Sequence, residues 1–186
     1  MPLGVESREE ASSHTQGSRP GGARIVVPYT DLLVPETLWA LQATGRQYET
    51  FDVSESDTSY LELISYLWSC GEGFAIVEHD IVVTDDVLDS FDACDQPWCV
   101  ASYPYLRGVY WGLGCTRFSA SLTRDFPDVI EAVATYEDQR HPPGHWCSLD
   151  AAITFALRRR LRAWPCQKHG TVQHLGNQLP THGCRS

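Results

Sequence analysis

Short apolar runs alternate with helix-length segments through the first half of the chain, and this order constrains the fold more than any other feature. The predicted strands are residues 25–30, 48–53 and 74–77. Between them, apolar residues recur at helical spacing around 32–41 and 60–68. Strands that alternate with helices of about a dozen residues form right-handed βαβ units. The sequence therefore predicts an α/β fold with a Rossmann-like mixed sheet, mostly parallel, and helices on both faces.

The second half of the chain is less regular. Residues 98–103 and 171–174 are predicted strands, and residues 126–136 and 148–164 are predicted helices. The segment 108–119 is rich in glycine and aromatic residues. Helices and strands thus recur here without the strict alternation of the first half.

Composition places the domain boundaries near the two ends of the chain. Residues 1–23 are rich in Ser, Gly and Glu and cannot bury enough apolar surface to order themselves, so we expect a disordered N-terminal tail. We expect a single domain over 24–176 and a C-terminal tail over 177–186. The apolar runs are far shorter than the roughly 18 residues that a membrane span needs, so no transmembrane segment is expected.

The charge of the chain is acidic and unevenly placed. It has 24 acidic and 14 basic side chains and a formal net charge of −10, which argues against a general nucleic-acid binder. No Lys or Arg lies between Arg46 and Arg107, so we expect cations near this stretch, either a metal or the Arg-rich second half. The alternative is a solvated acidic helix face, formed by Asp85, Asp86, Asp89 and Asp92.

Seven cysteines are present, an odd number, and the N-terminus has no apolar signal region. A reduced, cytoplasmic protein with structural cysteines is therefore expected. The spacings are poor for zinc. Cys94 and Cys99 are too far apart for a compact pair, and Cys166 with His169 is a half-site without a partner pair.

The most informative segment joins a buried strand to two acids. Residues 74–77 lead directly into Glu78-His79-Asp80, and open α/β sheets bind ligands at the carboxyl ends of their strands. Acids at i and i+2 on extended backbone point the same way, which suits one divalent cation held together with a phosphate. The first strand instead ends in Pro28-Tyr29-Thr30-Asp31, without a Gly-x-Gly-x-x-Gly turn, so a dinucleotide cofactor is disfavoured.

Three later features support a ligand site. Gly112 and Gly114 lie beside aromatic residues, where the backbone can approach a ligand closely. Asp150 stands at a predicted helix start, where a helix cap is the alternative. His174 ends the last predicted strand, where the alternative is an ordinary surface histidine.

In this order, the features resemble the glycosyltransferases of the GT-A fold, in a small, single-domain, family-2-like form. The resemblance covers roughly Arg24 to Gly176. It implies that Asp80 and His174 bind the metal, and that Glu78 faces the nucleotide ribose or reaches the metal through water. It also implies that Gly112 and Gly114 border the donor sugar.

The resemblance implies further roles. Asp150 matches the general base of inverting members. The remaining expected donor-binding residues are Pro28, Tyr29, Thr30, Asp52, His79 and Trp146. The sequence departs from the family pattern at Glu78, where the family has Asp, and at Leu149, where the family has an acid.

The resemblance thus implies a soluble, inverting glycosyltransferase that depends on Mn²⁺ or Mg²⁺ and uses a nucleotide-diphosphate sugar, a UDP-sugar above all. Its acceptor is unknown, and a glycan, small molecule or protein is favoured over nucleic acid. We expect Arg117 or the cluster Arg158–Arg162 to assist with phosphate charge, unless the cluster is a solvated helix face. The alternatives are a nucleotidyltransferase, whose Gly-rich basic loop after strand one is missing here, and a non-catalytic nucleotide-sugar binding module.

Overall fold

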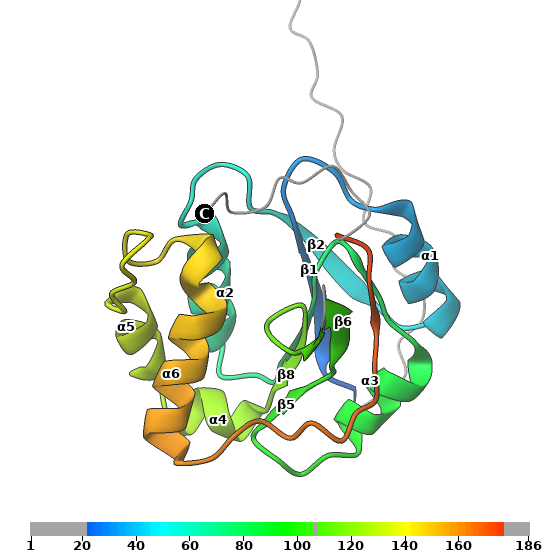
Figure 1. Ribbon diagram of the computed structural model, residues 1–186. Coiled ribbons are helices and arrows are strands. Elements are labelled where there is room, and N and C mark those ends of the chain that lie inside the picture. Colours follow the sequence, from blue (N-terminus) through cyan, green and yellow to red (C-terminus); the bar gives the residue numbers. More distant parts are fainter. Residues whose placement is uncertain (1–21, 106–107, 177–186) are drawn as a thin grey trace, which may run out of the picture.

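The computed structural model describes residues 22–105 and 108–176, and a five-stranded sheet forms its centre (Figure 1). The strands are β1 (Arg24–Tyr29), β2 (Tyr48–Asp52), β3 (Phe74–Val77), β4 (Ile81–Val82), β5 (Trp98–Val100), β6 (Tyr103–Tyr105), β7 (Gly108–Tyr110), β8 (Cys115–Phe118) and β9 (Gln173–His174). The helices are α1 (Pro35–Thr44), α2 (Ser59–Ser69), α3 (Asp85–Asp92), α4 (Ala120–Asp125), α5 (Val129–Ala134) and α6 (Leu149–Leu161), and a 3-10 turn, η1 (Trp146–Ser148), precedes α6.

The central sheet has the strand order β2-β1-β3-β8-β5. Strand β1 is parallel to β2 and β3, whereas β8 is antiparallel to both β3 and β5. The predicted mixed α/β sheet is therefore confirmed, but two of its four strand pairings are parallel and two antiparallel, so the mostly parallel pairing that the sequence predicts is not found. The insertion of β8 between β3 and β5 was not predicted, because this pairing joins residues far apart in the chain and leaves no local pattern.

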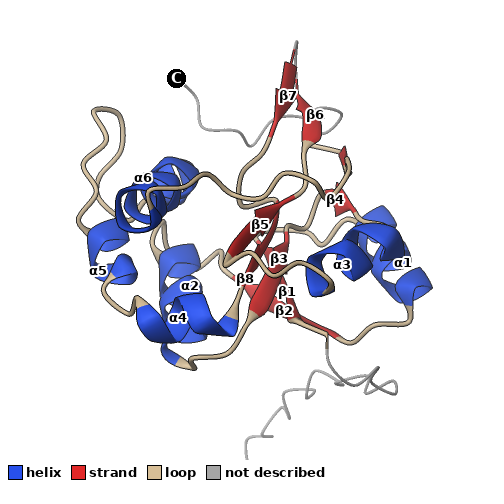
Figure 2. Cartoon of the chain, turned by 90° about the horizontal axis from the view of Figure 1, so that it is seen from below, coloured by secondary structure: helices blue, strands red, loops and turns tan. Residues whose placement is uncertain are grey.

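Helices cover both faces of the sheet, as the sequence predicts (Figure 2). Alternate residues of a strand point to opposite faces. Val26 and Ile76 accordingly pack in the core under α2, α5 and α6, while Ile25 and Val27 pack in the core under α1 and α3. This division leaves the carboxyl ends of β1, β2 and β3 open to the loops that follow them.

The predicted elements of the first half match the observed ones to within a few residues. The helix α1 ends at Gly45, whose φ of 65° is in the left-handed region that favours glycine. The predicted helix over 126–136 is shorter, because Pro127 disfavours helical backbone at Phe126, which separates α4 from α5. The tails predicted over 1–23 and 177–186 lie, except for residues 22–23, outside the described residues.

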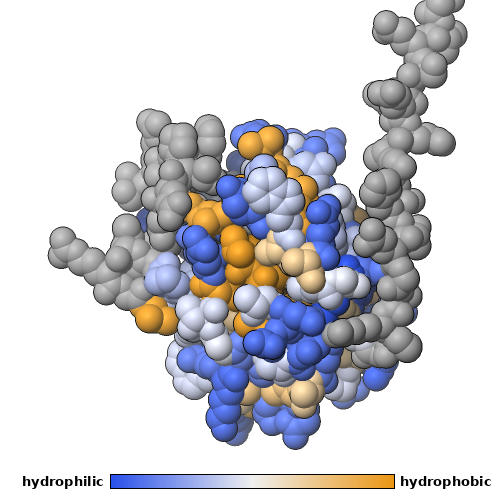
Figure 3. Space-filling view, turned by 90° about the vertical axis from the view of Figure 1, so that its right-hand side faces the viewer, coloured by the Kyte–Doolittle hydropathy of each residue, from blue (hydrophilic) through white to orange (hydrophobic). Residues whose placement is uncertain are grey.

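The part of the acidic stretch over residues 85–92 forms α3, and Arg46 supplies positive charge along this helix. Arg46, which follows α1, donates hydrogen bonds to Asp85, Asp89 and Asp92 on consecutive turns of α3. At α3 the positive charge thus comes from Arg46, a residue of the first half, because the α1–β2 turn packs beside α3. Figure 3 shows this side of the molecule, with hydrophilic side chains over its lower part and hydrophobic ones above.

Strand β9 lies away from the central sheet and pairs with β4. The chain leaves α6, runs along β5 and ends beside the turn that follows β3. None of the helices in residues 22–105 and 108–176 has the length and apolar character that crossing a membrane requires.

Candidate functional site

Glu78 lies at the carboxyl end of β3, in a tight turn. Its backbone N–H donates to the carbonyl of Gly114 (2.9 Å), and its own carbonyl accepts from the N–H of Ile81 (3.0 Å). The hydroxyl of Tyr60, at the start of α2, donates to Glu78 Oε1 over 2.9 Å. The carboxyl group is thus held between β3, α2 and the loop between β7 and β8.

Asp80 and His174 meet because β4 pairs with β9. Ile81 is opposite His174 in this antiparallel pair, and the N–H of Leu175 donates to the carbonyl of Asp80 (2.8 Å). These contacts bring Asp80 Oδ2 to 3.6 Å from His174 Nε2. The ring of Tyr103 packs on the imidazole with centroids 4.9 Å apart. His174 is therefore a largely buried partner of Asp80, and the interpretation as a surface histidine is wrong.

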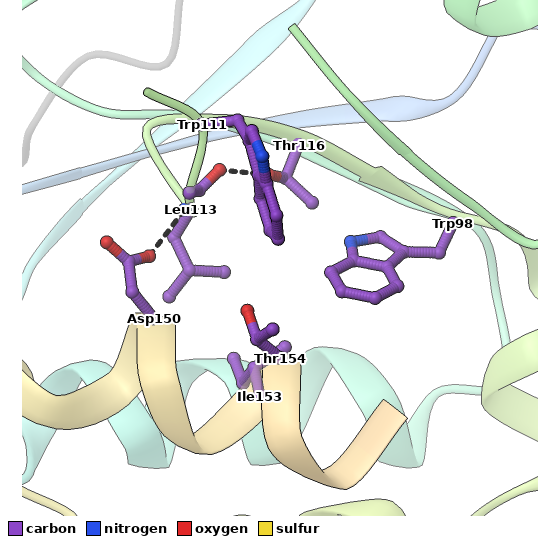
Figure 4. A pocket seen from close by; sticks show the side chains of 8 residues that line it. Trp98, Trp111, Leu113, Thr116, Asp150, Ile153 and Thr154 are labelled. Atoms are coloured by element: carbon purple, nitrogen blue, oxygen red, sulfur yellow. Dashed lines mark hydrogen bonds between the residues drawn. The ribbon is translucent and has the colours of Figure 1, made fainter. Parts of the chain in front are cut away.

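Asp150 lies in the first turn of α6 and faces the loop between β7 and β8 (Figure 4). Its Oδ1 accepts a hydrogen bond from the backbone N–H of Leu113 (2.5 Å). The carboxylate therefore binds a different segment of the chain instead of capping its own helix. Asp150 also lines a small pocket between α6 and the sheet, together with Trp98, Trp111, Gly112, Leu113, Thr116, Ile153 and Thr154.

The three carboxyl groups lie at the same end of the sheet, where Asp80 is buried, Glu78 is partly buried and Asp150 is exposed. Burial, followed by the charges of Asp150 and Asp80, raises the pKa of Glu78 to about 8, although the hydrogen bond from Tyr60 opposes this. Burial also raises the pKa of Asp150, against the opposing effects of the Leu113 N–H and of His174. Because like charges in a low-dielectric region destabilise one another, this arrangement favours a bound cation.

At three glycines the backbone lies close to these carboxyl groups. A Cβ at Gly112 would lie 2.6 Å from Asp150 Oδ2, and one at Gly176 would overlap Asp80 Oδ2. A Cβ at Gly114 would lie 3.4 Å from Glu78 Oε2, within ordinary contact. The predicted pair Gly112 and Gly114 therefore borders the carboxyl groups, and Gly176 is a third close approach.

The predicted donor-binding residues of β1 and β2 lie at the same end of the sheet. Tyr29 is paired with Asp52, and the carbonyl of Tyr29 accepts from the N–H of Val53 (2.8 Å). Asp52 is exposed, and hydrogen bonds from the side chain and backbone of Ser54 lower its pKa. Of the neighbouring candidates, Pro28 is buried and Thr30 is exposed. Tyr29, Thr30 and Asp52 form a rim at the ends of β1 and β2, in which Thr30 and Asp52 are exposed and Tyr29 is partly exposed.

The two remaining predicted donor-binding residues, His79 and Trp146, contact different segments of the chain. The carbonyl of His79 accepts from the N–H of Val34, which ties the turn after β3 to the segment after β1. Trp146 is 42% exposed and stacks on His145, and its backbone N–H donates to Asp57. Among the described residues, the hydrogen bond and ring contact of Trp146 are thus with Asp57 and His145 and not with the three carboxyl groups.

Three of the arginines expected to assist with phosphate, Arg117, Arg158 and Arg160, contact other groups. Arg117 donates to the carbonyls of Cys94 and Gln96, and Arg160 pairs with Asp128. Arg158 stacks on Trp164, 3.5 Å from the ring centroid. The expectation for Arg117 was wrong because its strand directs the side chain to the loop before β5.

Sequence reasoning missed Tyr60 and Tyr103, the two aromatic hydroxyl residues nearest the carboxyl groups. Burial is the largest cause that raises the pKa of both phenols, and the nearby acids add to it. In the sequence, each tyrosine looks like one more apolar position in a helix or strand. The signal for Gly176 in the sequence was its position two residues after His174.

Comparisons with known proteins add two weak structural similarities. No protein-family model matches the chain, and no curated protein matches it. A glycosyltransferase involved in the glycosylation of the major capsid of PBCV-1 is 11% identical with a TM-score of 0.42, and the match covers 88% of this chain and 95% of that one. The protein A197 from STIV is 10% identical with a TM-score of 0.42, over 64% of this chain and 70% of that one. At this level of similarity, a functional assignment has to rest on the site itself.

Proposed function

We propose that the protein is a metal-dependent glycosyltransferase that transfers a sugar from a nucleotide-diphosphate donor to a hydroxyl acceptor, with a UDP-sugar as the expected donor and inversion as the expected outcome. One observation carries the proposal. Glu78 and Asp80 after β3, Asp150 on α6 and His174 on the returning chain converge at the carboxyl end of a central strand. Ligand sites of open α/β sheets lie at this place.

The residues fit a divalent cation. Ligands of one Mg²⁺ or Mn²⁺ ion, each about 2.1 Å from the metal, lie within about 4.2 Å of one another, and Asp80 Oδ2 is 3.6 Å from His174 Nε2. The carboxylate oxygen is of the ligand type that Mg²⁺ and Mn²⁺ prefer, and the imidazole nitrogen would be a second, neutral ligand. When bound, the cation would supply positive charge for the diphosphate leaving group.

Asp150 is the proposed general base. Its carboxylate accepts a hydrogen bond from the Leu113 N–H, and its raised pKa makes it a stronger base than an aspartate with the ordinary pKa. The second oxygen, Oδ2, faces Gly112, where the absence of a Cβ leaves room for a reacting group. An acceptor hydroxyl bound there would lose its proton to Asp150.

The rim formed by Tyr29, Thr30 and Asp52 is the proposed place for the nucleobase and ribose, together with Pro28, His79 and Trp146. Its exposure at the end of β1 and β2 supports this role, because a nucleotide must enter from solvent. Glu78 follows β3 directly and comes two residues before Asp80 in the same turn. Its carboxyl group, next to Gly114, is placed to contact a ribose hydroxyl.

The test is turnover of a donor panel. We expect the purified chain to release nucleotide diphosphate from at least one nucleotide sugar with Mn²⁺ present and not with EDTA. Asp150→Asn should bind that donor within a few fold of wild type and lose activity by about 10² or more. Asp86→Asn, an exposed acid of α3, is the matched control and should be unchanged. Metal-dependent binding without any turnover would leave a nucleotide-sugar binding module instead of an enzyme.

A further inference from the structure

A second group of ligand-type side chains lies on the other side of the sheet, under α3. Cys94 follows α3, and Cys166 and His169 belong to the segment that follows α6. Their two sulfur atoms and one imidazole nitrogen all lie within 4.8 Å of one another. The Cys-x-x-His half-site, which lacked a partner pair in the sequence, therefore gains Cys94 through the fold.

His169 is held in the orientation that a metal ligand needs. Its side chain is buried, with 5% of the residue exposed, and its Nδ1 lies 3.0 Å from the hydroxyl of Ser90. Its Nε2 is buried and has no hydrogen-bond partner among the described residues. Metal-bound histidines typically use one nitrogen for the metal and the other for such an orienting hydrogen bond. The unpartnered Nε2 thus points to a missing ligand.

A third thiol completes the group. Cys99 lies in the same buried cluster as Cys94 and Cys166, and all three cysteines are free. Arg117 Nη1 lies 3.9 Å from the sulfur of Cys99, so its charge would offset part of the excess negative charge of three thiolates around Zn²⁺. A disulfide between two of these cysteines would leave both the third thiol and His169 Nε2 without a role.

We propose that Cys94, Cys166 and His169, with Cys99 as the fourth ligand, bind one structural Zn²⁺ ion. Three thiolates and one imidazole form a common tetrahedral zinc set. Zinc–ligand bonds of about 2.0–2.3 Å place ligand atoms roughly 3.5–3.8 Å apart. The ligand atoms of Cys94, Cys166 and His169, which lie within 4.8 Å of one another, therefore need only a small contraction, and the thiol of Cys99 has to move toward them. Binding displaces the three thiol protons, and no oxidant or reductant is involved.

The zinc ion would link the segment that follows α6, residues 162–174, to β5 at the edge of the central sheet. Cys166 exchanges backbone hydrogen bonds with Trp98 and Val100 of β5 (both 2.9 Å). Further along, Ser102 exchanges hydrogen bonds with Gly170 and Val172 before the chain reaches β9. Two ligands on each side of this junction would cross-link it, in a region where few backbone bonds hold the chain.

The first test measures zinc in the full-length chain, purified under reducing conditions with zinc supplied and then dialysed. We expect one zinc per chain by elemental mass spectrometry, and less than a tenth of that in Cys94→Ser and His169→Gln. Cys70→Ser, an exposed cysteine on α2's end, and Asp80→Asn should both retain zinc, which separates this site from the carboxyl cluster. A zinc-free wild type, or a disulfide among the three cysteines in its place, overturns the proposal.

The second test does not depend on the folding of the variants. Wild-type protein reconstituted with Co²⁺ should show thiolate-to-cobalt charge-transfer absorption, which zinc then displaces. Chelation of zinc from the wild type should speed amide hydrogen exchange in residues 94–102 and 166–174 by at least tenfold, and leave α2 unchanged. The absence of the charge-transfer band, or unchanged exchange in both segments, contradicts a structural zinc site.

Discussion

Asp80 Oδ2 lies 3.6 Å from His174 Nε2, although the two residues are far apart in the sequence. The pairing of β4 with β9 and the hydrogen bond from Leu175 N–H to the Asp80 carbonyl hold them together. Their contact brings the last segment of the domain, whose Val172 and Leu175 are buried, against the carboxyl end of the sheet. This relationship is the basis of the first prediction.

Asp80→Asn and His174→Ala should each weaken Mn²⁺-dependent binding of UDP by tenfold or more. In the wild type, binding should also weaken from about pH 7.5 to about pH 5.5, because a proton and the metal compete for the same histidine nitrogen. Calorimetry at both pH values measures this. Removal of His174 should abolish most of the pH dependence, and a His174→Ala variant with the wild-type affinity and pH profile would place His174 outside the metal site.

Gly112→Ala should behave like a loss of Asp150. The new Cβ would lie 2.6 Å from Asp150 Oδ2 and 2.8 Å from its Cγ, so the carboxylate must move and lose its bond to the Leu113 N–H. We expect a loss in transfer rate on the order of 10² with small changes in donor affinity. Gly114→Ala is the comparison, because its Cβ meets its nearest atoms at 3.3–3.4 Å. Equal rate losses in the two variants would contradict the steric argument.

Glu78→Gln should stabilise the metal-free protein at neutral and mildly alkaline pH. The pKa of Glu78 is about 8 in the fold and 4.5 as its ordinary value, so between these values the folded chain binds more protons than the unfolded chain. Stability attributable to this group therefore falls as pH rises from about 4.5 to about 8. Gln imitates the protonated form and avoids this loss.

Thermal denaturation in EDTA measures the effect. The melting temperature of Glu78→Gln should exceed that of wild type at pH 8 by a few degrees, a difference on the order of 1–3 kcal/mol. The two proteins should converge near pH 4.5. A constant difference at all pH values would show that Glu78 acts through packing and not through its charge.

Arg46→Ala should destabilise the fold by about 1–3 kcal/mol. The guanidinium is largely buried, with 9% of its side chain exposed, and it bonds three carboxylates of α3 that would then repel one another. Urea denaturation measures the change, and high salt should reduce it. Arg159→Ala, an exposed arginine on α6, should change stability by less than about 0.5 kcal/mol. Similar losses in both variants would mean that the charge network contributes little.

The local elements of the first half could be predicted because side-chain periodicity and turn residues act over a few positions. The strand Phe74–Val77 shows its burial in its own composition, and the acids that follow it mark the sheet end where a site lies. Gly45 marks the end of α1 for an equally local reason. The candidate residues Glu78, Asp80, Asp150 and His174 could therefore be named from sequence order together with a family resemblance.

Only the tertiary structure decided which distant groups meet. The position of β8 inside the sheet, the bonds from Arg46 to α3 and the approach of Cys94 to His169 each depend on which faces pack together across the whole domain. Such pairings are selected by the total apolar area that folding buries and by the backbone hydrogen bonds that form between the strands. The sequence by itself determined the strands, helices and ligand-type residues, because these are set by neighbours along the chain. The assembly of those residues into a carboxyl site and a cysteine–histidine site was decided by contacts between segments that share no local pattern.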